Sequence, residues 1–445
     1  MKTGFKFQYT IISFLITCLI VLTIRPSQLL AAPTPPDIHA ESAILMDAKT
    51  GTVLFEKNAN ERQYPASITK IMTSLLAIEN LNPTDVITFS HDAIFSIERN
   101  SSRIGLDVGE QITVDQALHA LLLMSANEVA NGLAEKVSGS IDNFAALMTN
   151  KAKELGAQNT HFVNPHGLHD KNHYTTAYDM ALITRAIYNN EYFLEIMSTP
   201  IYQIPPTNKT SEIRGLSQQH GLMNQLRNSY MYREDVIGGK TGYTDIARQT
   251  LVTTARKNDI DLIVVILKGE SHEIYKDTNA LLDYGFDSYK SLELHTPNDT
   301  LARLPIYSIK SGKLYEVGTS KIGVRESKNI IVETDLKRRE LITQVDLPEY
   351  LEIGIQENDV VGTITYIDKG KTLTQSELIV SAIDFTPAPY KANYPPISPT
   401  TSKLSLIFSI LIGIILFIIV IILLVRLKSK NKFKHKKLKF SKTIK

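Results

Sequence analysis

Short apolar runs interrupted by turn residues open and close the central part of the chain. Two apolar-rich runs flank a turn that contains Gly51, and two more flank Lys257-Asn258-Asp259. The four runs are 42–47, 52–56, 250–256 and 262–268. Each pair predicts a β-hairpin, and the last run is apolar enough to be buried on both faces.

Between these pairs the apolar positions recur at helical spacing. Thr113 to Gln116 has the form of a capping box and opens a helical run through Leu118, Leu121, Leu122, Val129 and Leu133. Residues 148–155 and 178–188 predict further helices. Strands at both ends and helices in the middle predict one α+β unit over residues 38–290, with a sheet completed by distant parts of the chain.

The pattern changes again after residue 290. Short β-type runs at 330–334, 341–345 and 364–367 are separated by Gly, Asn and Asp. We therefore expect a small all-β domain over residues 291–385, followed by a Pro-rich, extended linker over 386–403.

The first 32 residues have the form of a secretory signal peptide. Lys2 and Lys6 precede the apolar run 9–24, and small residues follow near Ala32. An uncleaved anchor is the alternative, but 16 apolar residues are few for a hydrocarbon layer of about 30 Å. The single cysteine, Cys18, lies in this run, so the mature protein is expected to have no disulfide and no cysteine-based site.

The other end predicts a membrane span. Leu404 to Val425 is 22 residues long and carries no charge, and a dense basic tail follows over 426–445. The positive-inside rule places that tail in the cytoplasm, so we expect a single-pass protein of the cell membrane with its catalytic domain on the outer face.

Charge is distributed unevenly along the chain. The formal net charge is +2, yet no acidic residue lies in 1–32 or 403–445, and the residues between carry 34 Lys and Arg against 46 Asp and Glu. The net negative charge of this central region argues against nucleic-acid binding, which needs clustered cations. The tail could bind nucleic acid, but its place beside a span favours orientation and lipid contact.

Three short motifs carry candidate chemistry. Ser67 and Lys70 lie one turn apart on an expected helix, where a partly neutral lysine can activate a serine hydroxyl. Ser125 and Asn127 interrupt an apolar helix face. Taken singly, the first pair is more often a helix cap with a solvated lysine, and the second fits a buried polar network equally well.

The third motif is Lys240-Thr241-Gly242-Tyr243, just before the second hairpin. It is not a phosphate-binding loop, because Glu234 stands where that loop needs its first glycine. Glycines at a strand edge instead suit close approach of a substrate backbone, with Lys240 and Thr241 facing a carboxylate or oxyanion.

Four histidines within a short loop form a possible zinc site: His161, His166, His169 and His173. Neither a cysteine nor a His-Glu-x-x-His helix accompanies them. Hydrogen-bonded loop histidines are the favoured interpretation, and we expect no metal and no cofactor.

In combination, Ser-x-x-Lys, Ser-x-Asn and Lys-Thr-Gly form the set of the penicillin-recognising serine enzymes, and here they occur in that order. Over residues 38–385 the chain resembles the low-molecular-mass penicillin-binding proteins of the D-alanyl-D-alanine carboxypeptidase type. The resemblance extends to 61–73, to Asn164-Pro165-His166-Gly167-Leu168 and to 281–286.

The resemblance implies a β-lactamase/DD-peptidase-like antiparallel sheet with a helical cluster, and an acyl-enzyme cycle on peptidoglycan stem peptides. Ser67 is the implied nucleophile, Lys70 the base and Ser125 the proton relay; Asn127, Lys240, Thr241, Gly242 and Tyr243 are the implied substrate-binding residues. The backbone N–H groups of Ser67 and Tyr243 would form the oxyanion hole. β-Lactams are implied as covalent inhibitors.

The sequence also departs from the family pattern. Some relatives carry an arginine where Glu270 follows Gly269, which puts one carboxylate contact in doubt. A β-lactamase would also need a loop that supplies a deacylating glutamate, and we identify no such loop in the sequence. D,D-endopeptidase action on crosslinks and an inactive wall-binding scaffold are two competing functions.

An active cleft requires Lys70 and Lys240 to face each other.

Overall fold

The computed structural model describes residues 34–225, 229–271 and 273–385. The predicted signal peptide, linker, span and tail all lie outside these residues: 1–32, 386–403, 404–425 and 426–445. Within the described ranges, no helix has the length and apolar character needed to cross a membrane.

A five-stranded antiparallel sheet organises residues 34–288. Its order is β2 (Val53–Lys57), β1 (Ser42–Asp47), β9 (Ile260–Gly269), β8 (Arg248–Lys257) and β7 (Val236–Thr244). Both predicted hairpins are confirmed, and β1 pairs with β9 so that Ser42 lies opposite Leu267. The sheet is therefore completed by distant parts of the chain, as the pattern predicted.

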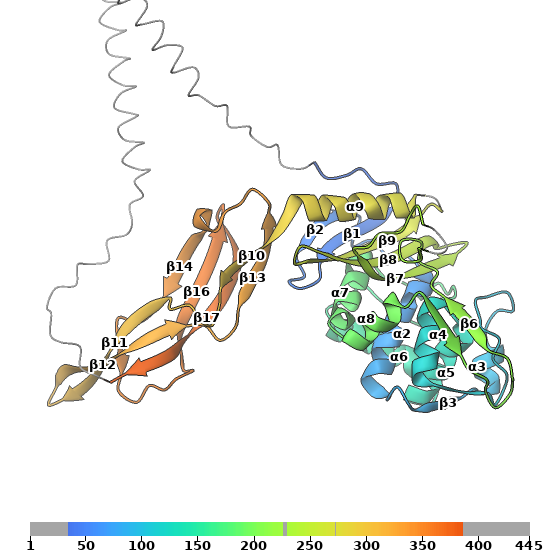
Figure 1. Cartoon of the computed structure of the whole chain (residues 1–445), viewed down its shortest axis with the longest axis horizontal. Helices are drawn as coiled ribbons and strands as arrows, with labels where there is room; N and C mark the ends of the chain where they lie inside the picture. Colours follow the sequence, from blue (N-terminus) through green and yellow to red (C-terminus); the bar gives the residue numbers. More distant parts are fainter. Residues whose placement is uncertain (1–33, 226–228, 272, 386–445) are drawn as a thin grey trace, which may run out of the picture.

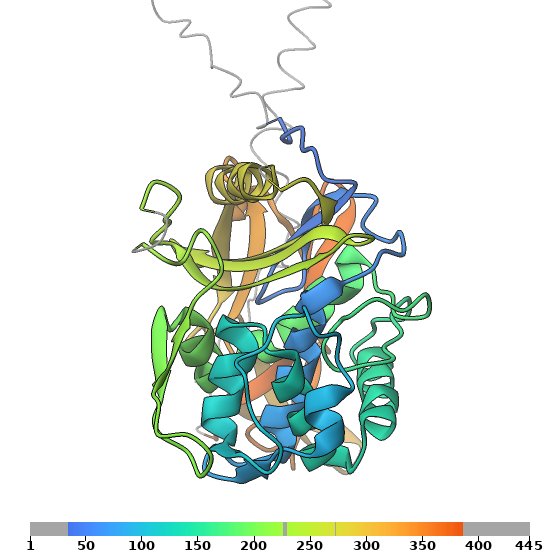
Figure 2. The same cartoon turned by 90° about the vertical axis from the view of Figure 1, so that its right-hand side faces the viewer.

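Helices cover both faces of this sheet (Figures 1 and 2). One face packs on a cluster that includes Met46, Val252 and Val265, and the other, through Leu45 and Val264, packs on α9 (Ile274–Ser288). The helices of the first face are α2 (Lys70–Asn80), α3 (His91–Phe95), α4 (Val114–Leu123), α5 (Asn127–Ser138), α6 (Ile141–Glu154), α7 (Ala177–Tyr188) and α8 (Glu191–Ser198). Alternation along each strand supplies apolar side chains to both layers, and the predicted α+β class is confirmed.

The prediction of one continuous run from Thr113 to Leu133 was wrong. The capping box at Thr113 is present, but α4 ends at Leu123 and α5 begins at Asn127. Ser125 between them has a φ of 60°, which is incompatible with a right-handed helix. The apolar spacing continues across the break because both helices pack into the same core.

Small elements border the helical cluster. They are η1 (Ala66–Thr69), β3 (Val86–Thr88) paired with β4 (Gln111–Thr113), and β5 (Ile201–Ile204) paired with β6 (Arg214–Ser217). The helix predicted at Ser67 is thus a 3-10 turn that continues directly into α2.

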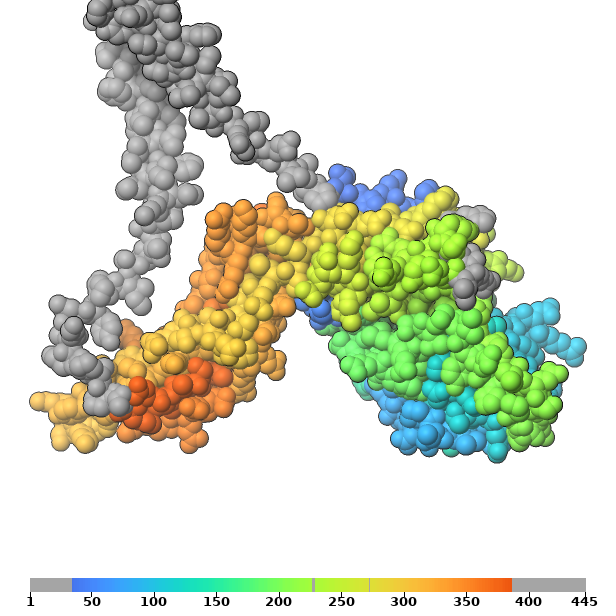
Figure 3. All heavy atoms as spheres, viewed as in Figure 1, coloured from blue at the N-terminus to red at the C-terminus, as the bar shows by residue number. Residues whose placement is uncertain are grey.

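Residues 289–385 form a second lobe that consists almost wholly of strands (Figures 1 and 3). β10 (Tyr289–His295) follows α9 directly and pairs with β13 (Lys328–Glu333). A six-stranded sheet contains β14 (Ile342–Asp346), β16 (Val360–Asp368), β17 (Lys371–Asp384), β12 (Lys313–Gly323), β11 (Ala302–Lys310) and β15 (Leu351–Glu352), with the short turn η2 (Arg338–Glu340) before β14. This lobe has a hydrophobic core of its own.

Candidate active site

A cleft of about 750 Å³ lies where η1, the α4–α5 junction and the edge strand β7 meet. A loop over residues 98–103 forms a further wall. The lining includes several residues from the predicted motifs: Ser67, Ser125, Asn127, Thr241, Gly242 and Tyr243. The structure therefore brings three motifs that are distant in sequence to one cleft.

Ser67 and Lys70 lie on consecutive turns at the entry of α2. Ser67 belongs to η1 and borders the cleft, while the Lys70 side chain is fully buried below it. Their side chains meet, with 3.0 Å between Lys70 Nζ and Ser67 Oγ. A serine within reach of a buried amine is the arrangement that nucleophile activation requires.

Lys70 Nζ has two other oxygen neighbours. It donates to Asn127 Oδ1 at 2.7 Å and to the His166 carbonyl oxygen at 2.6 Å. A neutral amine has two N–H groups for these acceptors and one lone pair left for the Ser67 proton. Burial lowers the pKa of Lys70 well below its ordinary value, and Lys240 lowers it further, whereas Glu128 opposes the shift. The environment thus favours the basic form.

The loop 164–168 fixes the carbonyl that receives Lys70. Asn164 Oδ1 accepts the backbone N–H groups of His166 and Gly167, and its amide donates to Leu168 O. Gly167 has a φ of +87°, and a Cβ there would lie 1.8 Å from Ala66 O. Only glycine permits this contact, which holds the His166 carbonyl against the start of α2.

Three of the four loop histidines, His161, His166 and His173, make hydrogen bonds through ring nitrogens, and His169 packs edge-on against Tyr64. His173 donates through Nε2 to Thr69 Oγ1 at 2.9 Å, because its Nδ1 accepts the Val163 N–H. Burial lowers the pKa of His173 to about 3 and the pKa of His166 well below its usual range. In the described part of the chain, no three His, Cys, Asp or Glu side chains are grouped as a metal ion requires.

Ser125 and Asn127 lie at the break between α4 and α5. Asn127 reaches Lys70 through its side-chain oxygen, while its backbone N–H donates to Ser102 O at 2.9 Å. The Ser125 hydroxyl is buried and has no hydrogen-bond partner among the described residues. A buried hydroxyl without a partner, at a backbone position of φ 60°, is available to a bound substrate.

The edge strand β7 closes the cleft on the opposite side. A Cβ at Gly242 would lie 2.8 Å from the Ser67 backbone nitrogen, so only glycine lets the strand run this close to η1. Tyr243, the next residue, lines the same cleft as Ser67. Lys240 is 1% exposed, and its Nζ donates to Thr241 O at 2.8 Å. Burial lowers the pKa of Lys240 to about 7.

The sequence singled out the 164–168 segment and Glu270, but it did not predict the contacts that these residues and His220 make around the site. The His166 carbonyl acts through its backbone, and His220 lies buried beside β7, where burial and then Lys240 lower its pKa to about 3. Glu270, which stands where some relatives carry an arginine, lies 3.3 Å from Arg248, and both side chains are exposed. No local pattern marks such contacts, because the sheet and the loops bring these residues together.

Comparisons with known proteins give one consistent result. The sequence profile of the family described as D-alanyl-D-alanine carboxypeptidase matches residues 30–271. The chain is 32% identical over 347 residues to D-alanyl-D-alanine carboxypeptidase DacF of Bacillus subtilis, with 76% of this chain and 84% of the relative covered. Identity to DacA of Escherichia coli K12 is 31%, over 78% of this chain and 84% of the relative.

The fold agrees with these relatives. Penicillin binding protein 5 from Haemophilus influenzae superposes with a TM-score of 0.65 at 27% identity, covering 79% of this chain and 99% of that one. A D-alanyl-D-alanine carboxypeptidase from Mycobacterium tuberculosis gives a TM-score of 0.52 at 30% identity, over 58% of this chain and 94% of the other. The chain therefore belongs to the D-alanyl-D-alanine carboxypeptidase family, the low-molecular-mass penicillin-binding serine peptidases.

Proposed function

We propose that this serine D-Ala-D-Ala carboxypeptidase removes the terminal D-alanine from peptidoglycan stem pentapeptides through an ester on Ser67. The observation that carries the assignment of Ser67 is the position of Lys70 Nζ, 3.0 Å from Ser67 Oγ and 2.7 Å from Asn127 Oδ1. The neutral amine accepts the hydroxyl proton while Oγ attacks the carbonyl carbon of the penultimate D-alanine.

The attack places a negative charge on the carbonyl oxygen. The Ser67 and Tyr243 amides donate to that oxygen, and the close approach of Gly242 to the Ser67 backbone nitrogen supports this assignment. One such donor contributes about 3–4 kcal/mol in serine peptidases. Lys240 and Thr241 bind the terminal carboxylate, and a cationic Lys240 next to a substrate anion is stabilised by that anion.

Collapse of the tetrahedral species breaks the C–N bond. The proton held by Lys70 passes through the Ser125 hydroxyl to the departing D-alanine nitrogen, which leaves as the free amino acid. Water then attacks the ester, Lys70 takes one water proton, and Ser67 recovers its hydroxyl proton from Lys70. β-Lactams, which resemble the terminal dipeptide, acylate Ser67 in the same way.

Export and anchoring belong to this proposal. Residues 1–32 direct export, Leu404 to Val425 spans the cell membrane, and the basic residues 426–445 stay in the cytoplasm. This arrangement places the cleft on the side of the membrane where peptidoglycan lies.

One experiment tests the chemistry and the anchoring together. Membranes carrying the full chain, or its Ser67→Ala variant, are washed at high pH and incubated with a stem pentapeptide and with a labelled penicillin. We expect the protein to stay with the membrane, and Ser67→Ala to lose the label and about 10⁴-fold or more of the D-alanine release.

The outcomes separate the parts of the proposal. Equal D-alanine release by both proteins contradicts the role of Ser67. Loss of the protein in the alkaline wash contradicts the span and leaves the chemistry intact. Stable penicillin binding with no D-alanine release supports a scaffold, and opened crosslinks on a dimeric stem peptide support an endopeptidase.

A further inference from the structure

Glu128 is a buried carboxyl group that the catalytic cycle described above does not use. It follows Asn127 in the first turn of α5 and is 2% exposed. Glutamate is seldom so buried unless its charge is compensated. The contacts of the Glu128 carboxylate therefore show which parts of the site its charge and its hydrogen bonds affect.

The carboxylate holds the loop that forms one wall of the cleft. Glu128 Oε1 accepts the backbone N–H of Ile104 at 2.7 Å and that of Gly105 at 3.1 Å. Asn127 fastens the same loop through its N–H to Ser102 O at 2.9 Å. Two adjacent residues of α5 thus fix the segment that includes the cleft-lining residue Arg103.

The same two residues act on the catalytic lysine. Asn127 accepts the hydrogen bond from Lys70, and the charge of Glu128 opposes the lowering of the Lys70 pKa by burial and by Lys240. The charge of Arg103 in the loop acts on Glu128, and the charge of Glu128 acts on Lys70 of α2. One carboxylate therefore binds the loop of the cleft wall and belongs to the residue next to Asn127, which accepts the hydrogen bond from the base.

Stability alone does not account for this carboxylate. Glu128 Oε2 is buried without a hydrogen-bond partner among the described residues, and so is Arg103 Nε. Burial raises the pKa of Glu128, which reflects the cost of keeping its charged form away from water. A buried acceptor without a partner is unfavourable for stability, and its position beside the cleft is consistent with a role in the site.

We propose that Glu128 is a positioning residue of the carboxypeptidase reaction, whose carboxylate fixes the cleft-lining loop on α5 and whose charge acts on Lys70. The inference rests on the proposed roles of Ser67 and Lys70. It assigns to Glu128 two separable effects: the shape of the cleft wall and the proton affinity of the base.

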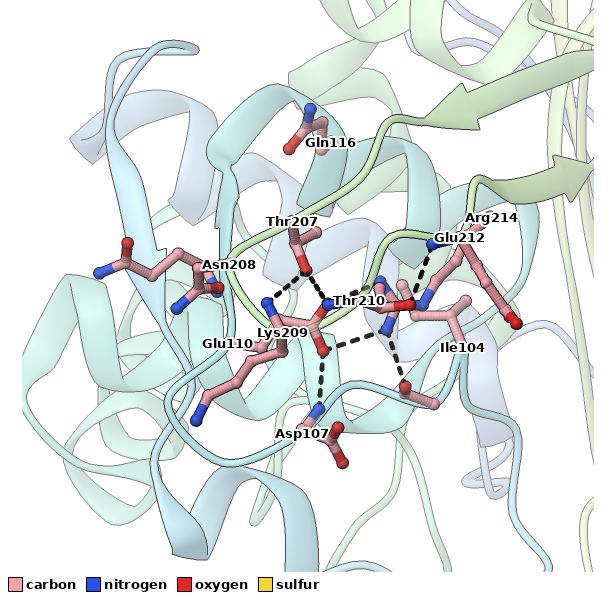
Figure 4. A network of polar contacts seen from close by, with 12 residues as sticks. Ile104, Asp107, Glu110, Gln116, Thr207, Asn208, Lys209, Thr210, Glu212 and Arg214 are labelled. Atoms are coloured by element: carbon pink, nitrogen blue, oxygen red, sulfur yellow. Dashed lines mark hydrogen bonds and ion pairs between the residues drawn. The ribbon is translucent and has the colours of Figure 1, made fainter.

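The structure offers a matched control in Glu110, shown in Figure 4. Glu110 is also fully buried and binds the continuation of the same loop, accepting the Asp107 N–H at 2.8 Å. Its two oxygens lie 2.6 and 3.0 Å from the Arg214 guanidinium, which also donates to Gly105 O. The charges that shift the pKa of Lys70 are Lys240 and Glu128, so Glu110 shares the structural role alone.

The test is the pH dependence of penicillin acylation, measured with the full chain in membranes for wild type, Glu128→Gln and Glu110→Gln. Removing the negative charge at Glu128 lowers the proton affinity of Lys70. We expect the acid limb of the acylation rate to move to lower pH by roughly half a unit, while Glu110→Gln leaves the limb in place.

A second variant separates charge from shape. Glu128→Asp keeps the charge but is too short to reach both loop amides, so we expect the wild-type acid limb with a roughly tenfold lower acylation rate. An unshifted limb in folded Glu128→Gln, an equal shift in Glu110→Gln, or wild-type rates in Glu128→Asp overturns the inference. If wild type is not acylated at Ser67 at all, the proposed function itself fails.

Discussion

The two lobes differ in what they bury. Among the described residues, the buried polar or charged side chains after Tyr289 are His295 and Ser320, whereas residues 34–288 bury two lysines, two glutamates and several histidines. Exposed large apolar side chains are equally numerous in the described parts of the two lobes, so they are denser in the smaller second lobe, where they are Ile309, Leu314, Tyr315, Ile342, Val345, Tyr350, Ile353, Val360 and Phe385.

This difference in buried polar side chains is explained by the catalytic site, which lies in the larger lobe. Keeping a lysine in a basic form requires burial, and burial of polar groups requires a large surrounding core and many hydrogen bonds. The larger lobe provides this with helices on both faces of its sheet. The second lobe needs only an apolar interior, and its exposed apolar residues leave more of its surface suited to contacts.

The largest expected effect is on Lys70. We expect Lys70→Met to reduce penicillin acylation by about 10³-fold or more, because the base is lost. The same change should raise the thermal unfolding midpoint of the larger lobe by a few degrees. The reason is that the folded pKa of Lys70 is lowered, so the unfolded chain binds more protons and the lysine destabilises the fold below its unfolded pKa.

Calorimetry at pH 6 and pH 9 checks the sign of this effect. The gain in stability should be larger at pH 6 and should shrink as the pH approaches the unfolded pKa of lysine, about 10.4. Lys153→Met, at an exposed position of α6, is the control and should change neither quantity. If Lys70→Met is less stable than the wild type, the buried lysine does not destabilise the larger lobe, and this part of the comparison between the lobes is wrong.

The next effect concerns pH and Lys240. Burial lowers the pKa of Lys240 to about 7, so the free enzyme loses this cation as the pH rises through that value. Carboxylate binding favours the charged form, so we expect kcat/KM for D-alanine release to fall roughly tenfold between pH 6 and pH 8 while kcat falls less. Lys240→Arg should lose this alkaline limb, and a flat wild-type profile contradicts the prediction.

The smallest effect lies in the second lobe. Tyr366 OH and His295 Nδ1 are 3.0 Å apart inside its core. We expect Tyr366→Phe to reduce the free energy of unfolding of this lobe by about 1 kcal/mol and to leave D-alanine release unchanged. Tyr315→Phe, at a half-exposed position, is the control. Altered catalysis in Tyr366→Phe would show that the lobes are energetically coupled.

Much of the fold could be predicted because the apolar and turn residues that specify its strands and helices are close together in the sequence. The hairpin strands β1, β2, β8 and β9 and the helix α7 follow from alternation, turn residues and helical spacing. The break between α4 and α5 could not be predicted in this way. Its cause is the backbone conformation of Ser125, and the apolar spacing runs on through it.

The candidate site was predictable for a different reason. Ser67, Lys70, Ser125, Asn127 and Lys240 belong to motifs whose spacing is fixed by the turns that carry them. Glu128 and the His166 carbonyl are different, because their roles depend on a loop and a helix end that meet only in the folded chain. The helix α9 was not predicted either, although Ile274, Leu281 and Leu282 recur at helical spacing on the face that packs on the sheet.

The pairing of β1 with β9 makes the catalytic sheet depend on residues more than 200 positions apart in the sequence, such as Ser42 and Leu267. β9 ends at Gly269, so a nascent or truncated chain that stops earlier leaves β1 without its neighbour and Lys240 without a finished sheet. Contacts this distant in sequence form slowly, because a long loop must close first. We therefore expect a chain truncated before β9 to expose the edge of β1 and to lack acylating activity.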